Sequence, residues 1–403
     1  MAREAIARRR LPDVARRLGD ERMEALRSAG AAVLWTRVLV GVIAVVAAGV
    51  LGADAGNAFN FDQPALTHPA GGLGDALLAP LARWDAVWYL DIAHSGYGGP
   101  STAFFPLYPL VVRALSPGGS PALLLVMSYV VSLAALGGAL YLMHRLVALE
   151  LGERVARPAV LLLALFPGAL WLGAPYSESL FLLLSIGAFY AARTDRWAWA
   201  GACAALASAT RSAGIVLIVP LLVLWWRSAP RRWHNLGWVA LAPAGLALYS
   251  LYLALSLGDG FAYLHLQEVW FRSFGGPFGA IPDGARAAFD GVRQLASGSR
   301  DHVFFTAAGG DPFSVAWHNI ELFGFLVFAV VATVGVLRRL PLAYGAYTLA
   351  ALALPLSFPV GPQPLMSLPR FLGVLFPLFM WLAVVSEGER RRRFAMAVLA
   401  LGL

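Results

Sequence analysis

Long apolar runs alternate with short polar segments along the whole chain of 403 residues. The runs cover residues 31–53, 121–147, 158–174, 178–193, 197–210, 213–227, 236–257, 317–337, 341–358 and 371–385. They lack the period-two alternation of barrel strands, and lipid leaves no water for unpaired backbone groups. The pattern therefore predicts an all-α, polytopic integral membrane protein with roughly 10–11 transmembrane helices. Several runs hold only about 15 residues, which predicts short helices around an enclosed cavity.

The composition agrees with a membrane protein and excludes other classes. Hydrophobic residues make up 59% of the chain and charged residues only 13%, whereas a soluble domain carries roughly a quarter charged residues. The net charge of +8 comes entirely from arginine, and the arginines cluster between apolar runs, so we expect no nucleic-acid partner. Cys203 is the single cysteine, which leaves no disulfide framework and no cysteine-based metal site.

The arginine clusters predict how the chain is oriented. Residues 1–30 mix arginine with acidic residues and are interpreted as a cytoplasmic N-terminal segment before an uncleaved first span. Counting spans from there places two long loops outside, residues 55–120, a large loop carrying amphipathic helices, and residues 258–315, together with the shorter connections 174–179, 210–212 and 359–369. Nearly all basic clusters then fall on the cytoplasmic side. The exceptions, which lie on the external side or close to it, are Arg83, Arg113, Arg211 and Arg370.

The chain is predicted to form one membrane-embedded domain over residues 1–403, since no internal repeat is evident. A last apolar run starts at Phe394 and stops at Leu403, which is too short for a span, so we expect the C-terminus to be truncated. The expected location is a bacterial-type cell membrane, with the N-terminus in the cytoplasm.

Residues 83–113 hold the densest mixture of charges, aromatic rings and turn residues in the chain. Asp85 and Asp91 lie among tryptophans and tyrosines, which favour a membrane–water boundary. A carboxylate held among such rings is partly desolvated and its pKa can rise towards the range useful for a base. We interpret this stretch as an active-site loop on the membrane surface, within the external catalytic loop 55–120.

Each acid in the loop also has a simpler interpretation. Asp85 precedes a helical pattern, so it is either a helix N-cap, a general base, or both. Asp91 and His94 share a helical face, where a local hydrogen bond is favoured over a metal pair. Asp85 and Asp91 are too far out of phase to share a face, so only one is expected to be catalytic.

Three further charged residues follow or precede apolar runs on the external side. Glu178 begins a helix, where it either complements the helix dipole or forms a polar wall of the active-site cavity. Arg211 and Arg370 either bind a phosphate through their two-pronged guanidinium groups or reach out to lipid headgroups. An ionisable group near a span is a functional candidate by default.

These residues occur in blocks that resemble a known family. The blocks are Arg83-Trp84-Asp85, Gly96-Tyr97, Ala103-Phe104-Phe105-Pro106-Leu107, Phe166-Pro167, Tyr176-Ser177-Glu178-Ser179-Leu180-Phe181, Arg211-Ser212-Ala213-Gly214 and Pro369-Arg370-Phe371. In this order they resemble the phosphatidylinositol-glycan class V (PIG-V) mannosyltransferases and their bacterial relatives, from about residue 80 to 385. The chain departs from the family pattern at His94 and Ala213.

The resemblance implies a GT-C-like fold and a specific reaction. The enzyme would transfer mannose from polyprenyl-phosphate-mannose to a hydroxyl of a glycolipid or glycan on the non-cytosolic face, with inversion. Asp85 would be the catalytic base. Because a phosphate leaves as a stable anion, one carboxylate suffices, and Arg211 and Arg370 would hold the phosphate. The residues expected to bind substrates are Arg83, Trp84, Trp88, Asp91, His94, Tyr97, Phe105, Tyr176, Glu178, Arg211 and Arg370.

We expect no cofactor and assign no metal ligands, and we expect no nucleotide site because the sugar arrives on a lipid. The partners would be the lipid-linked donor, the acceptor and membrane lipids. Two alternatives remain open. A transporter or flippase of a lipid-linked intermediate would favour ionisable groups near the midplane and paired halves, and the third interpretation is a non-catalytic assembly subunit.

Overall fold

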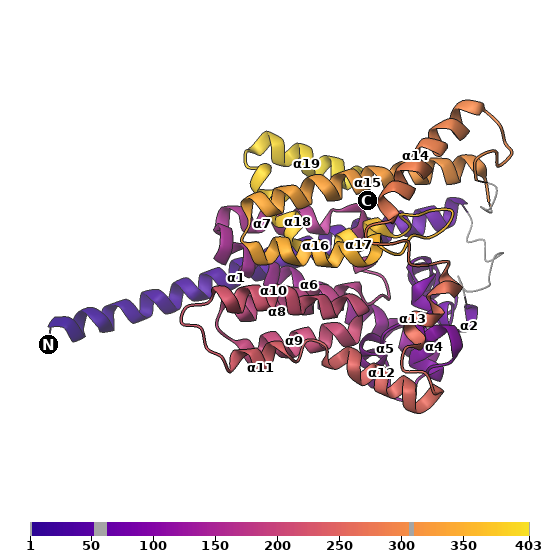
Figure 1. The fold of residues 1–403 in the computed structure, drawn as a ribbon. Coiled ribbons are helices and arrows are strands. Elements are labelled where there is room, and N and C mark those ends of the chain that lie inside the picture. Colours follow the sequence, from indigo (N-terminus) through magenta and orange to yellow (C-terminus); the bar gives the residue numbers. More distant parts are fainter. Residues whose placement is uncertain (1, 52–62, 306–309, 403) are drawn as a thin grey trace.

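The chain folds into a bundle of helices in the computed structural model, which describes residues 2–51, 63–305 and 310–402 (Figure 1). Residues 52–62 and 306–309, which belong to parts of the two predicted external loops, lie outside the described residues. Within the described ranges the only β-type pairing is an isolated bridge between Arg272 and Val360. The predicted all-α class is therefore confirmed.

The helices follow the predicted apolar runs. In chain order they are α1 (Ala2–Leu51), α2 (Pro64–Thr67), α3 (Gly72–Leu78), η2 (Ala79–Leu81), α4 (Asp85–Ser95), η3 (Gly99–Ala103), α5 (Leu107–Ala114), α6 (Pro121–Leu151), α7 (Glu153–Ala164), η4 (Pro167–Leu172), α8 (Glu178–Arg193), α9 (Trp197–Thr210), η5 (Ser212–Leu217), α10 (Ile218–Arg227), α11 (Asn235–Val239), α12 (Ala244–Leu257), α13 (Ala262–His265), η6 (Leu266–Trp270), α14 (Ala280–Ser297), α15 (Pro312–Arg339), α16 (Leu342–Leu356), α17 (Leu368–Gly373), α18 (Phe376–Val385) and α19 (Glu389–Gly402).

Among the described residues, three helices are long and apolar enough to cross a membrane: residues 19–50 of α1, α6 and α15. A fourth candidate is the pair formed by α12 and residues 262–270, which is bent by 91°. Other apolar helices of the described chain hold only 10–17 residues. In the run 158–174 the helix breaks before Pro167, which begins η4. The chain is thus an all-α membrane protein, and the count of roughly 10–11 spans stays a prediction.

The polar segments between the helices gather at two opposite ends of the bundle (Figure 1). We call one of them the opposite end, because it lies opposite the candidate site described below. There Glu150 at the end of α6 binds Arg193 at the end of α8 and Tyr344 at the start of α16. Arg232 pairs with Asp195 at the same end. We call the other the site end, where α4 and α8 begin and α17 lies. The alternation of the predicted loops agrees with this division, while which end faces the cytoplasm stays a prediction.

The first loop forms a compact layer of short helices at the site end. Its helices α4 and α5 bury apolar side chains in one cluster with α6. The members of this cluster include Tyr89, Leu90 and Ile92 of α4, Tyr108 and Val112 of α5, and Leu124 and Leu125 of α6. The buried Tyr108 hydroxyl donates to the Ser128 carbonyl of α6 at 2.9 Å. The loop is therefore fixed to the bundle by burial of apolar area and by paired polar groups.

A partly buried arginine of α1 binds the segment that leads to the site. Arg37 of α1 donates hydrogen bonds to the carbonyls of Ala169 (2.6 Å) and Ala164 (3.2 Å), in η4 and at the end of α7. Carbonyls at a helix end lack intrahelical donors and attract a cation. The contact fixes the position of η4, which precedes Tyr176 and Glu178 in the chain.

Candidate active site

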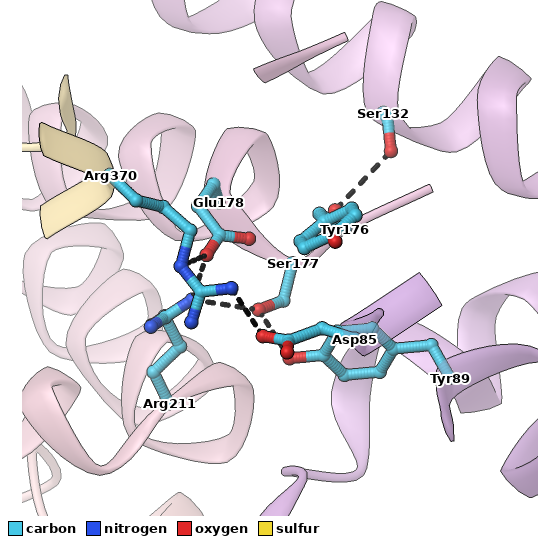
Figure 2. A network of polar contacts seen from close by, with 8 residues as sticks. All are labelled: Asp85, Tyr89, Ser132, Tyr176, Ser177, Glu178, Arg211 and Arg370. Carbon is cyan, nitrogen blue, oxygen red and sulfur yellow. Dashed lines mark hydrogen bonds and ion pairs between the residues drawn. The ribbon is translucent and has the colours of Figure 1, made fainter. Parts of the chain in front are cut away.

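Four segments that are far apart in the sequence bring two acids and two arginines together at the site end (Figure 2). Asp85 is the first residue of α4, Glu178 the first residue of α8, Arg211 lies between α9 and η5, and Arg370 belongs to α17. Arg370 binds the Asp85 carboxylate through Nη1, and its Nε lies 3.1 Å from Glu178 Oε1. Arg211 Nη1 lies 2.5 Å from the same Glu178 oxygen. Glu178 is thus shared by both arginines.

The four charged groups are largely shielded from solvent. The exposed fraction of the side chain is 1% for Glu178, 14% for Arg370, 17% for Arg211 and 24% for Asp85. Burial alone would lower the pKa of Arg370, but the carboxylates of Asp85 and Glu178 raise it overall. Ion pairs in such an environment interact strongly but have lost their hydration, so each group depends on its partner. The cluster is therefore held together as one unit.

The backbone before Asp85 has an unusual conformation. Trp84, the residue before the helix, has φ 54° and ψ −118°, a region that a tryptophan rarely adopts. No side chain caps the start of α4, and Asp85 itself lies inside the helix with its carboxylate on Arg370. The helix-cap interpretation of Asp85 is therefore wrong, and the strained residue instead directs this carboxylate into the cluster.

Hydrogen bonds from neighbouring hydroxyl groups brace the cluster. The hydroxyl groups of Tyr89 in α4 and Ser177 form a hydrogen bond of 2.7 Å. Arg211 Nη1 donates to the Ser177 hydroxyl oxygen at 3.3 Å. The Tyr176 hydroxyl donates to the Arg83 carbonyl at 2.8 Å. Burial, aided by the nearby Asp85 charge, raises the pKa of Tyr176 well above its usual value, so this phenol stays neutral.

Asp91 and His94, also in the predicted site, do not join the cluster. In the described part of the chain the Asp91 carboxylate has no hydrogen-bond or ion-pair partner. His94 Nδ1 lies 3.2 Å from the Gly119 carbonyl oxygen. The predicted hydrogen bond between the two residues is therefore not formed. Over residues 2–51, 63–305 and 310–402 no group of three or more His, Cys, Asp or Glu side chains is placed to hold a metal ion.

The predicted aromatic residues of the first loop contact other rings and backbone groups, whereas the Tyr176 ring lies 5.7 Å from Arg370 Cζ. Trp84 lies edge-on to Trp171, with ring centroids 5.4 Å apart. Trp88 stacks on Phe104 and meets Trp270, while Tyr97 donates to the Phe104 carbonyl at 2.9 Å. Phe105 packs on Tyr249 and Tyr263. These rings join the loop to α12 and α13, and their predicted contacts with substrates stay predictions.

Two further residues, to which the sequence analysis gave no role, lie beside the arginines. Phe371 follows Arg370 in α17, and its ring lies 5.8 Å from Arg211 Cζ and 5.6 Å from Arg370 Cζ. Arg272, from the segment between η6 and α14, lies 5.7 Å from the same ring. The only signal for Arg272 in the sequence was its place in a segment predicted to lie outside with the other charged residues.

Together, the fold and the site define an all-α membrane protein with an ionised and mostly buried polar site at one end of its helices. The family model described as Mannosyltransferase (PIG-V) matches residues 33–225, which confirms the predicted resemblance over this part of the chain. The matched region includes Asp85, Glu178 and Arg211, whereas Arg370 and Arg272 lie beyond it.

Curated relatives point to the same family. GPI alpha-1,6-mannosyltransferase 2 of Rattus norvegicus is 37% identical over 175 residues, which are 40% of this chain and 35% of that protein. GPI mannosyltransferase 2 of Chaetomium globosum is 36% identical over 143 residues, covering 31% of this chain and 30% of that protein. The matched part of the chain thus spans about a third of the length of these relatives.

A solved structure shows a weaker likeness. The crystal structure of the Archaeoglobus fulgidus oligosaccharyltransferase is 14% identical, covers 78% of this chain and 46% of that chain, and gives a TM-score of 0.41. A TM-score this low does not assign a shared fold. The GT-C-like architecture therefore stays a prediction.

Proposed function

We propose that the chain is a membrane mannosyltransferase that uses polyprenyl-phosphate-mannose as donor and a hydroxyl of a glycolipid or glycan as acceptor. The observation that carries the proposal is the meeting of Asp85 with Arg370 and Arg211 at one end of the bundle. This arrangement places a proton acceptor beside two cations suited to a phosphate. The family match and the names of the relatives support mannose as the sugar.

In the proposed reaction Asp85 acts as general base. Its Oδ2 faces Arg370, and in the described chain Oδ1 has no hydrogen-bond partner. Oδ1 would accept the proton of the acceptor hydroxyl while the hydroxyl oxygen attacks the anomeric carbon of mannose. The bond from that carbon to the phosphate oxygen breaks, and its electron pair leaves with the polyprenyl phosphate. A single displacement inverts the configuration at the anomeric carbon.

The arginines would stabilise the charge that builds on the leaving phosphate. A guanidinium group can donate two parallel hydrogen bonds to phosphate oxygens, and in a partly buried site each bond is stronger than in water. In the structure both arginines are paired with carboxylates. The phosphate would compete for Arg370, and this would free Asp85 to accept the proton.

The test is transfer by purified protein reconstituted into sealed lipid vesicles. Radiolabelled polyprenyl-phosphate-mannose is supplied with a glycolipid acceptor, and the label is followed into the acceptor. We expect transfer by the parent protein. Release of label across a sealed vesicle without transfer would support the transporter alternative, and absence of both would support an assembly subunit.

The non-cytosolic position of the site is tested by cysteine labelling. Cys203 is partly buried in α9, so its replacement by alanine gives a background without other cysteines. A cysteine introduced at Gly99, which is exposed at the site end, is expected to react with an impermeant reagent in intact cells. Labelling only after the cytoplasmic face is opened would reverse the proposed orientation.

A further inference from the structure

We propose that Arg272 is a third phosphate-binding arginine, which completes with Arg211 and Arg370 an anion-binding subsite around Phe371. The inference rests on the proposed function and adds a residue to it. The Cζ atoms of Arg370, Arg272 and Arg211 lie 5.6, 5.7 and 5.8 Å from the centre of the Phe371 ring. Three cations are thus neighbours around one side chain, although they come from three different segments.

The three arginines differ in their partners. Arg211 and Arg370 share the carboxylate of Glu178, and Arg370 also binds that of Asp85. Arg272 forms no ion pair with any described residue, and its guanidinium donates one hydrogen bond, to the Phe358 carbonyl at 3.3 Å. The cluster therefore holds three positive and two negative groups. A partly buried guanidinium with unused donors is costly unless an anion is bound.

The electrostatic environment of Arg272 also favours a bound anion. Burial, together with the like charges of Arg370 and Arg211, lowers the pKa of Arg272 to about 10, while the charge of Asp85 opposes this change. The group still carries its proton at neutral pH. An anion bound between the arginines would relieve the repulsion among the three guanidinium groups.

Backbone contacts hold Arg272 at this position. Arg272 forms an antiparallel bridge with Val360, and Gly275 N–H donates to the Ser357 carbonyl at 3.0 Å. Phe278 N–H donates to the Ser357 hydroxyl at 3.1 Å. The segment of Arg272 is thus joined to residues 357–360, which precede α17 in the chain. These contacts therefore join the segment of Arg272 to the stretch that leads into α17, the helix that carries Arg370.

The reaction gives the third arginine a distinct task. The donor phosphate is a diester with one negative charge, and the leaving polyprenyl phosphate is a monoester with a charge of about −1.5 to −2 at neutral pH. Negative charge at the phosphate therefore grows as the bond to mannose breaks. Arg211 and Arg370 share the acid Glu178, whereas Arg272 has no acid partner among the described residues, so Arg272 would add positive charge beside the phosphate as its negative charge grows.

The experiment measures binding of a short-chain polyprenyl phosphate and mannose transfer by the same detergent-purified proteins. Arg272→Gln is expected to raise the Kd for the polyprenyl phosphate about tenfold or more and to lower kcat for transfer, since both depend on the extra charge. Arg272→Lys keeps the charge but not the two-pronged geometry, and we expect an intermediate loss. The matched control is Arg286→Gln, an exposed arginine of α14, which should leave both quantities unchanged.

The outcomes separate the inference from the proposed function. If the parent protein binds the phosphate and transfers mannose while Arg272→Gln does both equally well, Arg272 is no phosphate ligand and only this inference fails. If the parent protein does not transfer mannose, the proposed function fails. A melting temperature of Arg272→Lys equal to that of the parent, with weaker phosphate binding, supports a binding role over a structural one.

Discussion

The two ends of the bundle use the same residue type in different ways. At the opposite end Arg193 and Arg232 are 42% and 52% exposed, and Asp195, the partner of Arg232, is 61% exposed. At the site end Arg211 and Arg370 are 17% and 14% exposed and share Glu178, which is 1% exposed. Exposed pairs contribute little to stability, whereas buried groups depend strongly on their partners. Arginines that flank apolar runs are thus of two kinds, which differ in burial and in whether two arginines share one acid.

The largest difference is expected for the proposed base. Asp85→Asn keeps the shape of the side chain but removes the proton acceptor, so transfer should fall by about two to four orders of magnitude. The matched control is Asp91→Asn on the same helix, which contacts no described charged group. The initial rates of mannose transfer by the two variants are compared with that of the parent protein. Equal losses in both variants would mean that the cluster does not mark the catalytic acid.

The next effect concerns stability. Glu178→Gln leaves two mostly buried arginines without their shared carboxylate, and loss of one partner of a buried ion pair costs about 3–5 kcal/mol. We expect a clearly lower melting temperature in detergent. Asp195→Asn removes an exposed partner at the opposite end and serves as control. A similar melting temperature for both variants would contradict the comparison of the two ends.

A glycine at the site end permits the approach of α17. A Cβ at Gly168 would lie 2.0 Å from the Pro369 carbonyl oxygen, directly before Arg370. Gly168→Ala should therefore displace α17, lower stability by about 1–3 kcal/mol and reduce transfer. At Gly137 in α6 a Cβ meets no atom within 4 Å, so Gly137→Ala should behave as the parent. Thermal unfolding and transfer rates of the two variants test this.

Replacement by lysine separates phosphate binding from a role at the lipid headgroups. Lysine keeps the charge but cannot bind two phosphate oxygens in the same way. We expect Arg211→Lys or Arg370→Lys to lower transfer about tenfold or more, which corresponds to roughly 1.4 kcal/mol of transition-state stabilisation. Arg193→Lys at the opposite end should transfer at the parent rate. If all three variants keep full activity, the leaving-group site lies elsewhere, with Arg83 and Arg113 as the next candidates.

The smallest effect is expected for an exposed ion pair. Arg232 and Asp195 are 3.2 Å apart and both are more than half exposed, so Arg232→Gln should change stability by about 1 kcal/mol or less and leave transfer unaffected. The melting temperatures of Arg232→Gln and Glu178→Gln, measured under the same conditions, show how strongly each end of the bundle depends on its ion pair. A large loss of stability would show that exposure does not distinguish the two kinds of arginine.

The sequence by itself determined the class of protein and the residues from which its site is built. Long apolar runs have to form helices in lipid, because each helix pairs its own backbone groups. Most arginines between the runs fall on the predicted cytoplasmic side, so charged residues beside a run on the predicted external side are functional candidates. For this reason four of them are conspicuous from their positions in the chain alone: Asp85, Glu178, Arg211 and Arg370. The family blocks around them led to the same residues and to the resemblance, which the family model matches over residues 33–225.

Only the tertiary structure decided which of these residues meet. Helical spacing links neighbours on one helix, and it suggested a contact between Asp91 and His94 that is not formed. It carries no information on pairs such as Arg370 and Asp85, which are 285 positions apart in the chain. Arg272 was not recognised because its role depends on a bridge to another segment and on the ring of Phe371. Such contacts arise when several segments pack at one end of the bundle, and there burial determines which charges need each other.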